Sequence, residues 1–242
     1  ARIDEFFARM QTERFDLAIQ MHGGGGNSNP FVRRLGARVS LGLCAPGAPA
    51  LDRWMPYFYW QPEVMRFLEL VSLAGAPPVT VEPHIAVTPA DREAASLALS
   101  EDGRPLVVLH PGASDPRRRW APERFAAVGS ALLEAGYALA LVGIPAEREV
   151  VDAVLRAMPA ELVPAACDLC GALSLQALTG LLARAALVIG NDSGPRHLAE
   201  AVGTPTVGIY WCGNLINAGP ATRTFHRPHL SWRLNCPVCG QN

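Results

Sequence analysis

Apolar residues recur along this chain at two spacings, most regularly in its second half. After residue 105, short continuous apolar runs alternate with segments in which apolar residues return every three or four positions. Such runs predict strands buried on both faces, and the three-to-four spacing predicts helices with one buried face. The pattern predicts strands at 106–110, 137–143, 162–165, 187–190 and 206–210, and helices at 89–100, 122–135, 146–157, 174–184 and 194–202.

The first hundred residues show a less regular version of this pattern. They predict helices at 1–14, 27–35 and 63–74, strands at 15–21 and 38–43, and an irregular loop at 44–62. Residues 79–89 are punctuated by prolines, which is typical of a connection between domains. We therefore expect an N-terminal domain at 1–85, which we take to be incomplete, and a C-terminal domain at 86–242.

Strands that alternate with helices place the protein in the α/β class, with parallel sheets of the doubly wound, Rossmann-like kind. In such sheets ligands bind beyond the carboxyl ends of the strands. Three loops of the second domain are predicted to lie there, at 111–121, 143–147 and 190–197. These loops carry the candidate chemistry.

The charge balance narrows the range of partners. The 242 residues include 21 basic and 22 acidic side chains, a formal net charge of −1, and every basic one is Arg. This near-neutral balance excludes a broadly basic nucleic-acid surface, and the absence of Lys excludes Schiff-base chemistry on a Lys. No apolar run is long enough to span a membrane and the N-terminus has no signal-peptide pattern, so we expect a cytoplasmic protein.

The loop after the strand at 106–110 reads His-Pro-Gly-Ala-Ser-Asp-Pro-Arg-Arg-Arg-Trp. Ser114 offers a hydroxyl, and the guanidinium groups of Arg117, Arg118 and Arg119 suit phosphate oxygens. A solvated basic turn is the alternative interpretation. The position directly after a buried strand favours an anion site.

The loop at 190–197 follows a strand and opens a helix, so backbone amides and the helix dipole favour an anion there. Its candidate residues are Asn191, Asp192, Ser193, Gly194 and His197. Asp192 and Ser193 are also suited to capping the helix, and His197 either contacts a phosphate or fixes the loop. In the third loop, Glu147 either complements a helix dipole or accepts hydrogen bonds from ligand hydroxyls.

Three segments together resemble the family-nine glycosyltransferases, the heptosyltransferase-like enzymes of lipopolysaccharide core synthesis. They read HPGAS…RRRWAPERFAAVG, LVGIPAERE and LVIGNDSGPRHLAEAVGTPTVGIY, and FDLAIQMHGGG in the first domain is also similar. The resemblance implies a GT-B fold, with two Rossmann-like domains facing across a cleft. It also implies an inverting transfer that needs no metal or cofactor, from a nucleotide sugar such as ADP-heptose to a saccharide or glycolipid acceptor.

Carried onto this sequence, the resemblance makes Asp192, Ser193, Gly194 and His197 the donor-phosphate motif. Glu147 then matches the acidic residue that holds ribose or sugar hydroxyls. One of the three arginines at 117–119 matches a basic residue that is usually Lys. The family places this residue before a Trp-Pro pair, and here Ala121 separates Trp120 from Pro122, so the register is open.

On the acceptor side the candidates are His22, Gly23 and Gly24, although a role for His22 in structuring the loop is the alternative. The resemblance implies an Asp general base near the start of the first domain, and we expect it upstream of residue 1. The acceptor of such an enzyme would bring it into peripheral contact with the inner membrane surface. A non-catalytic nucleotide-sugar-binding module and a GT-B-type epimerase are the alternative functions.

Other features remain open at the level of sequence. The pairs Cys167–Cys170 and Cys236–Cys239 have the spacing of a zinc site, but we expect no metal. Aromatic residues between Trp54 and Trp60 suit either sugar stacking or loop packing. Trp232 and Arg233 are weak candidates for contact with a nucleotide base.

Overall fold

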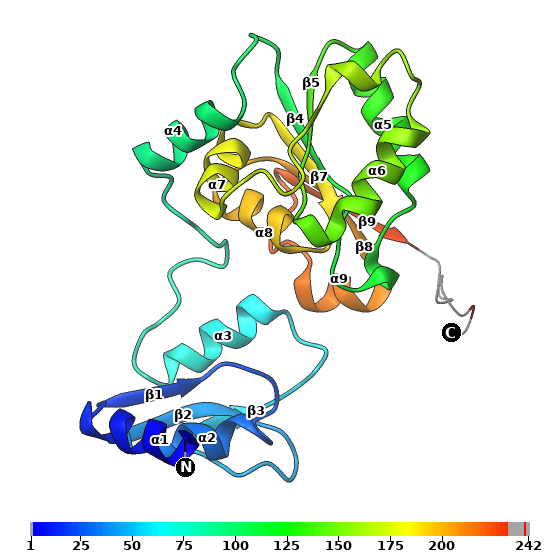
Figure 1. Cartoon of the computed structure of the whole chain (residues 1–242). Coiled ribbons are helices and arrows are strands. Elements are labelled where there is room, and N and C mark those ends of the chain that lie inside the picture. Colours follow the sequence, from blue (N-terminus) through cyan, green and yellow to red (C-terminus); the bar gives the residue numbers. More distant parts are fainter. Residues whose placement is uncertain (1, 232–239, 241–242) are drawn as a thin grey trace. The chain divides into compact units, whose positions relative to one another are not determined.

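The computed structural model describes residues 2–231 and 240. The chain divides into two compact units, Ala1–Val81 and Glu82–Asn242, so the division falls four residues before the boundary expected from sequence. Among the described residues, no helix is both long and apolar enough to cross a bilayer. Each unit is an α/β domain with parallel strands (Figure 1).

Unit 1 contains a sheet of order β1-β2-β3, and both strand pairs are parallel. Its elements are α1 (Arg2–Thr12), β1 (Leu17–Gln20), α2 (Ser28–Arg34), β2 (Val39–Cys44), β3 (Arg53–Pro56) and α3 (Glu63–Ser72). The prediction of an irregular loop at 44–62 was wrong for β3. Its sequence, Arg-Trp-Met-Pro, has only two consecutive apolar residues before a Pro, which is too short a run to predict a strand, and it becomes a strand through pairing with β2.

Unit 2 contains a six-stranded parallel sheet of order β6-β5-β4-β7-β8-β9. Its strands are β4 (Leu106–His110), β5 (Ala138–Leu141), β6 (Ala166–Asp168), β7 (Leu187–Asn191), β8 (Thr206–Trp211) and β9 (His226–Ser231). Its helices are α4 (Pro89–Ala98), α5 (Pro122–Glu134), α6 (Arg148–Ala157), α7 (Leu175–Arg184), α8 (Gly194–Ala201) and α9 (Cys212–Ala218), with 3-10 turns η1 (Pro116–Arg118), η2 (Pro145–Glu147) and η3 (Val163–Ala165).

Local signals explain where several helices of unit 2 begin and end. Thr88 and Asp91 form a capping box at the start of α4, and Ser174 accepts a hydrogen bond from the Ala177 amide at the start of α7. Gly136, with φ of +86°, follows α5 in the left-handed conformation that ends many helices. These caps are among the features that the sequence predicted.

Three elements of unit 2 differ from the prediction. The strand expected at 162–165 is the 3-10 turn η3, because Pro164 has no amide for a strand ladder, and β6 begins one residue later. The helix expected from residue 146 begins as η2 and continues as α6. The helix α9 and the strand β9 were not predicted. The β9 sequence His-Arg-Pro-His-Leu-Ser carries one apolar side chain besides its Pro, and the strand forms through pairing with β8.

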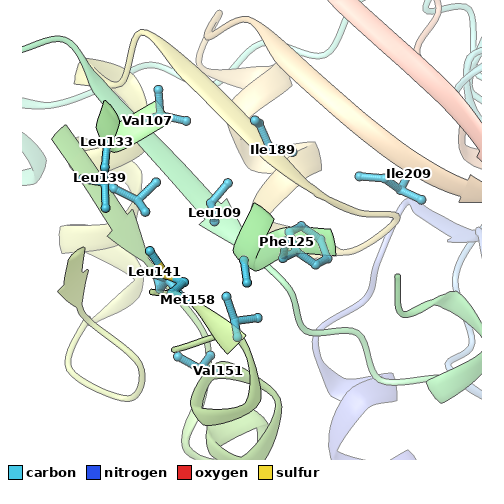
Figure 2. Packing of buried hydrophobic residues seen from close by; sticks show 12 residues of the cluster. Val107, Leu109, Phe125, Leu133, Leu139, Leu141, Val151, Met158, Ile189 and Ile209 are labelled. Carbon is cyan, nitrogen blue, oxygen red and sulfur yellow. The ribbon is translucent and has the colours of Figure 1, made fainter. Parts of the chain in front are cut away.

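Alternate residues of each central strand point to opposite faces of the sheet, and each face has its own core. Val107 and Leu109 pack with α5 and α6 residues, as Figure 2 shows. Leu106 and Val108 pack instead with residues of α4, α7 and α8. Helices therefore cover both faces of the sheet (Figure 1), which leaves the loops at the strand ends as the places where polar side chains gather.

Candidate functional site

The strand order of unit 2 reverses its direction of growth at β4. From β4 the chain adds β5 and β6 on one side and then returns to add β7, β8 and β9 on the other. Ligands of doubly wound sheets bind outside the carboxyl ends of the strands at such a switch point, here between β4 and β7. The predicted loops at 111–121 and 190–197 follow these two neighbouring strands, and 143–147 follows β5.

Asn191 joins the two loops at the switch point. Its side-chain oxygen accepts from the Trp120 amide at 3.0 Å, and its amide nitrogen donates to the carbonyls of Pro111 at 2.8 Å and Gly112 at 3.3 Å. The residue has no exposed surface. The side chain of Asn191 thus holds the β4 and β7 loops together, and its predicted role in donor binding stays a prediction.

His110, the last residue of β4, bonds to both the β5 loop and the β7 loop. Its Nε2 lies 3.2 Å from Oε2 of Glu147 in η2, and its Nδ1 lies 2.8 Å from Oγ of Ser193, the residue before α8. The ring is 2% exposed. Sequence reasoning did not select His110, because it is the last residue of an apolar strand, although it is also the first residue of the HPGAS segment that could have drawn attention to it.

Glu147 is buried but remains an acceptor. Burial alone would raise the pKa of its carboxyl, and the hydrogen bonds from His110 and from the Ile144 amide outweigh burial and lower it. Both of these bonds reach Oε2, and within the described part of the chain no hydrogen bond to Oε1 is found. An ionised oxygen at this place suits a ligand hydroxyl.

Gly112 is required for this arrangement. A Cβ added there would lie 2.1 Å from Oε1 of Glu147, whose carboxylate is anchored on its other side. We expect Gly112→Ala to lower the free energy of unfolding by about 2 kcal/mol. Chemical denaturation measures this cost. In a Glu147→Ala background the same methyl group has room, so an equal cost in both backgrounds would disprove the contact.

Asp192 is 3% exposed and holds three partners. Its Oδ1 lies 3.0 Å from Nε2 of His197, and its Oδ2 accepts from Nδ2 of Asn214 at 2.6 Å and pairs with Arg118 at 3.5 Å. Burial would raise the pKa of this carboxyl, and the hydrogen bonds from His197 and Asn214 together lower it. The negative charge of Asp192 therefore orders one residue of α8, one of α9 and one of the arginine loop.

Ser193 does not cap α8, contrary to one expectation from sequence. In the described residues it makes no side-chain bond to its own helix, because its hydroxyl is turned to His110. The first amides of a helix have no acceptor within the helix. The amides of Gly194 and Arg196 are thus placed to bind an anion, and an added Cβ on Gly194 meets no atom within 4 Å.

The three arginines of the β4 loop go to different partners. Arg117 pairs with Asp115 at 2.6 Å, Arg118 reaches Asp192, and Arg119 donates to the Ala113 carbonyl at 2.8 Å. Arg118 is thus the arginine turned to the β7 loop. Ser114, on the same loop, is exposed.

His197 is fixed by a buried arginine that the sequence gave no reason to select. Nη2 of Arg196 donates to Nδ1 of His197 at 2.6 Å, and its Nη1 pairs with Glu200 at 2.9 Å. Arg196 has no exposed surface and lies over the ring of Tyr210. Nη2 also lies 3.0 Å from Nε2, but the ionised Asp192 carboxylate at Nε2 only accepts, so the proton of a neutral ring is assigned to Nε2 and Nδ1 is the acceptor for Arg196.

The sequence and the fold of this chain are similar to those of known proteins. The family described as "Glycosyltransferase family 9 (heptosyltransferase)" matches residues 3–226. The lipooligosaccharide heptosyltransferase 2 of Haemophilus influenzae is 32% identical over 138 residues, which are 54% of this chain and 39% of that protein. The lipopolysaccharide heptosyltransferase 2 of Escherichia coli K12 is 29% identical over 126 residues, 52% of this chain and 34% of that one.

The chain belongs to glycosyltransferase family 9.

Solved structures agree on the fold. A family-9 glycosyltransferase from Veillonella parvula has a TM-score of 0.78 at 21% identity, covering 94% of this chain and 66% of that one. The E. coli ADP-heptose lps heptosyltransferase II has a TM-score of 0.77 at 21% identity, covering 93% and 71%. The predicted α/β class of GT-B type, with two Rossmann-like domains, is confirmed. The matched part of the chain spans only 39% and 34% of the length of the two curated relatives.

In unit 1 of this family-9 chain, the acceptor-side candidates His22, Gly23 and Gly24 line a shallow cavity of about 510 Å³ with Phe31. The His22 carbonyl accepts from Ser28 at 3.1 Å and also from the buried Gln20, so its backbone is fixed while its side chain is exposed. An added Cβ on Gly24 would lie 2.6 Å from Cβ of Ala45. Packing alone thus requires Gly at position 24, and an acceptor role for these residues stays a prediction.

The aromatic residues of unit 1 are mostly exposed. Phe58, Tyr59 and Trp60 expose 63%, 59% and 60% of their surfaces, and Trp54 exposes 49%. The alternative that this segment packs onto the domain through its aromatic side chains is therefore wrong for these four. Arg66 of α3 holds the backbone of part of this segment, because it donates to the carbonyls of Phe58, Tyr59 and Gln61.

The cysteine pairs add no site among the described residues. Cys167 and Cys170 carry free thiols whose pKa burial raises, and Sγ of Cys170 donates to the Ile144 carbonyl at 3.3 Å. No group of three or more His, Cys, Asp or Glu residues suited to a metal occurs in the described ranges. Trp232, Arg233, Cys236 and Cys239 lie outside the described residues, so the predictions made for them stay predictions.

Proposed function

We propose that this family-9 chain is the core of a glycosyltransferase that binds a nucleoside-diphosphate sugar on unit 2. The observation that carries this proposal is that the loops after β4, β5 and β7 are joined at the switch point: Arg118 pairs with Asp192, and His110 bonds both to Ser193 at the start of α8 and to Glu147. Cation and amides suit a diphosphate, and an ionised carboxylate suits ribose or sugar hydroxyls. ADP-heptose is the proposed donor, because a structural relative from E. coli is described as a heptosyltransferase with ADP.

The proposed reaction transfers the sugar to a saccharide or glycolipid of the lipopolysaccharide kind, with inversion. As the bond to the diphosphate breaks, negative charge grows on the leaving oxygens. Arg118 and the amides of Gly194 and Arg196 are placed to stabilise that charge electrostatically, so the proposed transfer needs no metal. A lipid-linked acceptor would bring the protein to the cytoplasmic side of the inner membrane as a peripheral partner.

Thermal shift and calorimetry with ADP, UDP and GDP test the donor site. We expect ADP to stabilise the protein, and Arg118→Ala to weaken its binding about tenfold, the loss of one charge-assisted contact. Arg156→Ala is the charge-matched control, because Arg156 is exposed on α6 away from these loops. Failure of all three nucleotides to stabilise the protein would refute the donor site. Binding without sugar transfer by the complete protein would favour a non-catalytic module.

A further inference from the structure

The two hydrogen bonds of the His110 ring determine which of the three bonded groups carry a proton. A neutral imidazole carries one N–H, and an ionised carboxylate only accepts. Since Glu147 is the partner of Nε2, the proton of a neutral ring lies on Nε2. Nδ1 is then an acceptor, and the Ser193 hydroxyl 2.8 Å away must donate its only proton to it. In this state Ser193 has no proton to offer to a ligand.

A second proton on His110 reverses the last of these bonds. Both ring nitrogens then donate, so Oγ of Ser193 accepts from Nδ1 and its own O–H is released. Ser193 is half-buried, and the residue after it is exposed. A diphosphate group at the α8 amides offers only acceptor oxygens, so the released O–H is the form of Ser193 that binds it.

We propose that binding of a nucleoside diphosphate at this site is coupled to uptake of a proton by His110, which turns the Ser193 hydroxyl from a donor toward His110 into a donor toward the diphosphate. The proposal rests on the donor site proposed above and adds a positioning residue to it. His110 is 2% exposed and acts on the ligand through Ser193.

The surrounding charges are consistent with this coupling. The Glu147 carboxylate faces Nε2 from the β5 loop and favours the cation, and Arg119 of the β4 loop, which acts on the same carboxylate, opposes it. Beyond Ser193, the Asp192 carboxylate is already paired with His197 and Arg118. A diphosphate that binds there adds negative charge on the Nδ1 side of the His110 ring, where the bridge contains no acidic side chain. The bound state therefore favours the imidazolium more than the free state does.

Isothermal calorimetry with ADP-ribose tests the coupling. Its diphosphate is esterified at both ends and lacks the ionisation near pH 6 of a terminal phosphate, so any proton uptake belongs to the protein. Titrations in buffers of different ionisation heat should show that about 0.5 to 1 proton is taken up per ligand bound within pH 6–8.5. Where one full proton is taken up, the affinity should fall about tenfold for each unit by which the pH rises. Binding with no proton uptake anywhere in this range would overturn the inference and leave the donor site standing. Absence of any binding would count against the donor site itself.

Three variants locate the proton. His110→Gln should abolish uptake and make the affinity independent of pH, and Ser193→Ala should cut uptake by more than half while leaving the ring in place. His197→Gln, which removes the other histidine of the site, should keep the uptake although it weakens binding. Two results would overturn the assignment of the proton to His110: full proton uptake by Ser193→Ala, or loss of uptake in His197→Gln but not in the other variants. Both can be measured even if His110→Gln fails to fold.

Discussion

Replacing Asp192 with Ala is expected to weaken binding of ADP about 100-fold, or about 2.7 kcal/mol. The change releases His197, Asn214 and Arg118 at once, because one buried carboxylate holds all three. Groups that must be placed within a fraction of an ångström lose much of their effect when their support is removed. Calorimetry at neutral pH measures the affinity, and circular dichroism verifies that the variant is folded.

A competing effect runs in the opposite direction. The Asp192 carboxylate repels a diphosphate, so its removal alone would strengthen binding. This repulsion is small, because the negative charge of Asp192 is already compensated by Arg118 and by the hydrogen bond from His197. We therefore expect the loss of the ordered side chains to outweigh the loss of repulsion, so that ADP binds more weakly. An affinity of folded Asp192→Ala equal to or above that of the wild type would show that repulsion dominates and that the assignment is wrong.

Two controls sharpen this result. Asp192→Asn keeps an acceptor for His197 but turns an amide toward the Asn214 donor, so its affinity should lie between those of wild type and Ala variant. Asp115→Ala removes another carboxylate of the same site, one that pairs with Arg117 at the rim. It should change ADP affinity by less than about threefold, as is usual for an exposed ion pair.

Arg66→Met is expected to lower the free energy of unfolding of unit 1 by about 3 kcal/mol. Arg66 is 1% exposed, and its guanidinium donates to three backbone carbonyls and pairs with Glu63. Met keeps the apolar stem but none of the donors, and each of the three partly buried carbonyls that loses its partner costs about 1 kcal/mol. Hydrogen exchange of unit 1 peptides, read by mass spectrometry in the full chain, measures the loss.

The segment 57–62 should show the effect first, because Arg66 ties it to α3. Arg53→Met is the matched control. Arg53 is an exposed arginine of the same unit that donates to one carbonyl, that of Leu73, at 2.9 Å. It should cost less than about 1 kcal/mol. Equal exchange in both variants would mean that the buried guanidinium contributes little to the stability of unit 1.

The sequence predicted those parts of the fold that are decided locally. The strands β4 and β7 are continuous apolar runs because both of their faces are covered, and the caps at Thr88 and Ser174 follow from side chains within a few residues. Strands that form through a neighbour were missed. Both β3 and β9 are edge strands without a long apolar run, and they form through hydrogen bonds to their partners, β2 and β8.

In the candidate site too, the sequence predicted what is decided locally and missed the contacts between distant residues. The loops were found because they follow apolar strands, and Asp192, Glu147 and Arg118 lie where strand order brings them. The partners of these groups were not foreseen. Capping of α8 was one of two expectations for Ser193, and its hydroxyl bonds instead to His110, which is 83 residues away in sequence. A contact between such distant residues leaves no pattern at any single spacing.

The position of β4 at the centre of its sheet has a consequence for synthesis of the protein. The strand bonds to β5 on one edge and to β7 on the other, and Asn191 lies 80 residues after the Pro111 carbonyl that it binds. At about 5–20 residues per second, a ribosome needs roughly 4 to 16 s to supply that second partner. During this interval the backbone N–H and C=O groups on one edge of this apolar strand are open to other nascent chains. Folding of this domain in the cell thus depends on what shields that edge until β7 emerges.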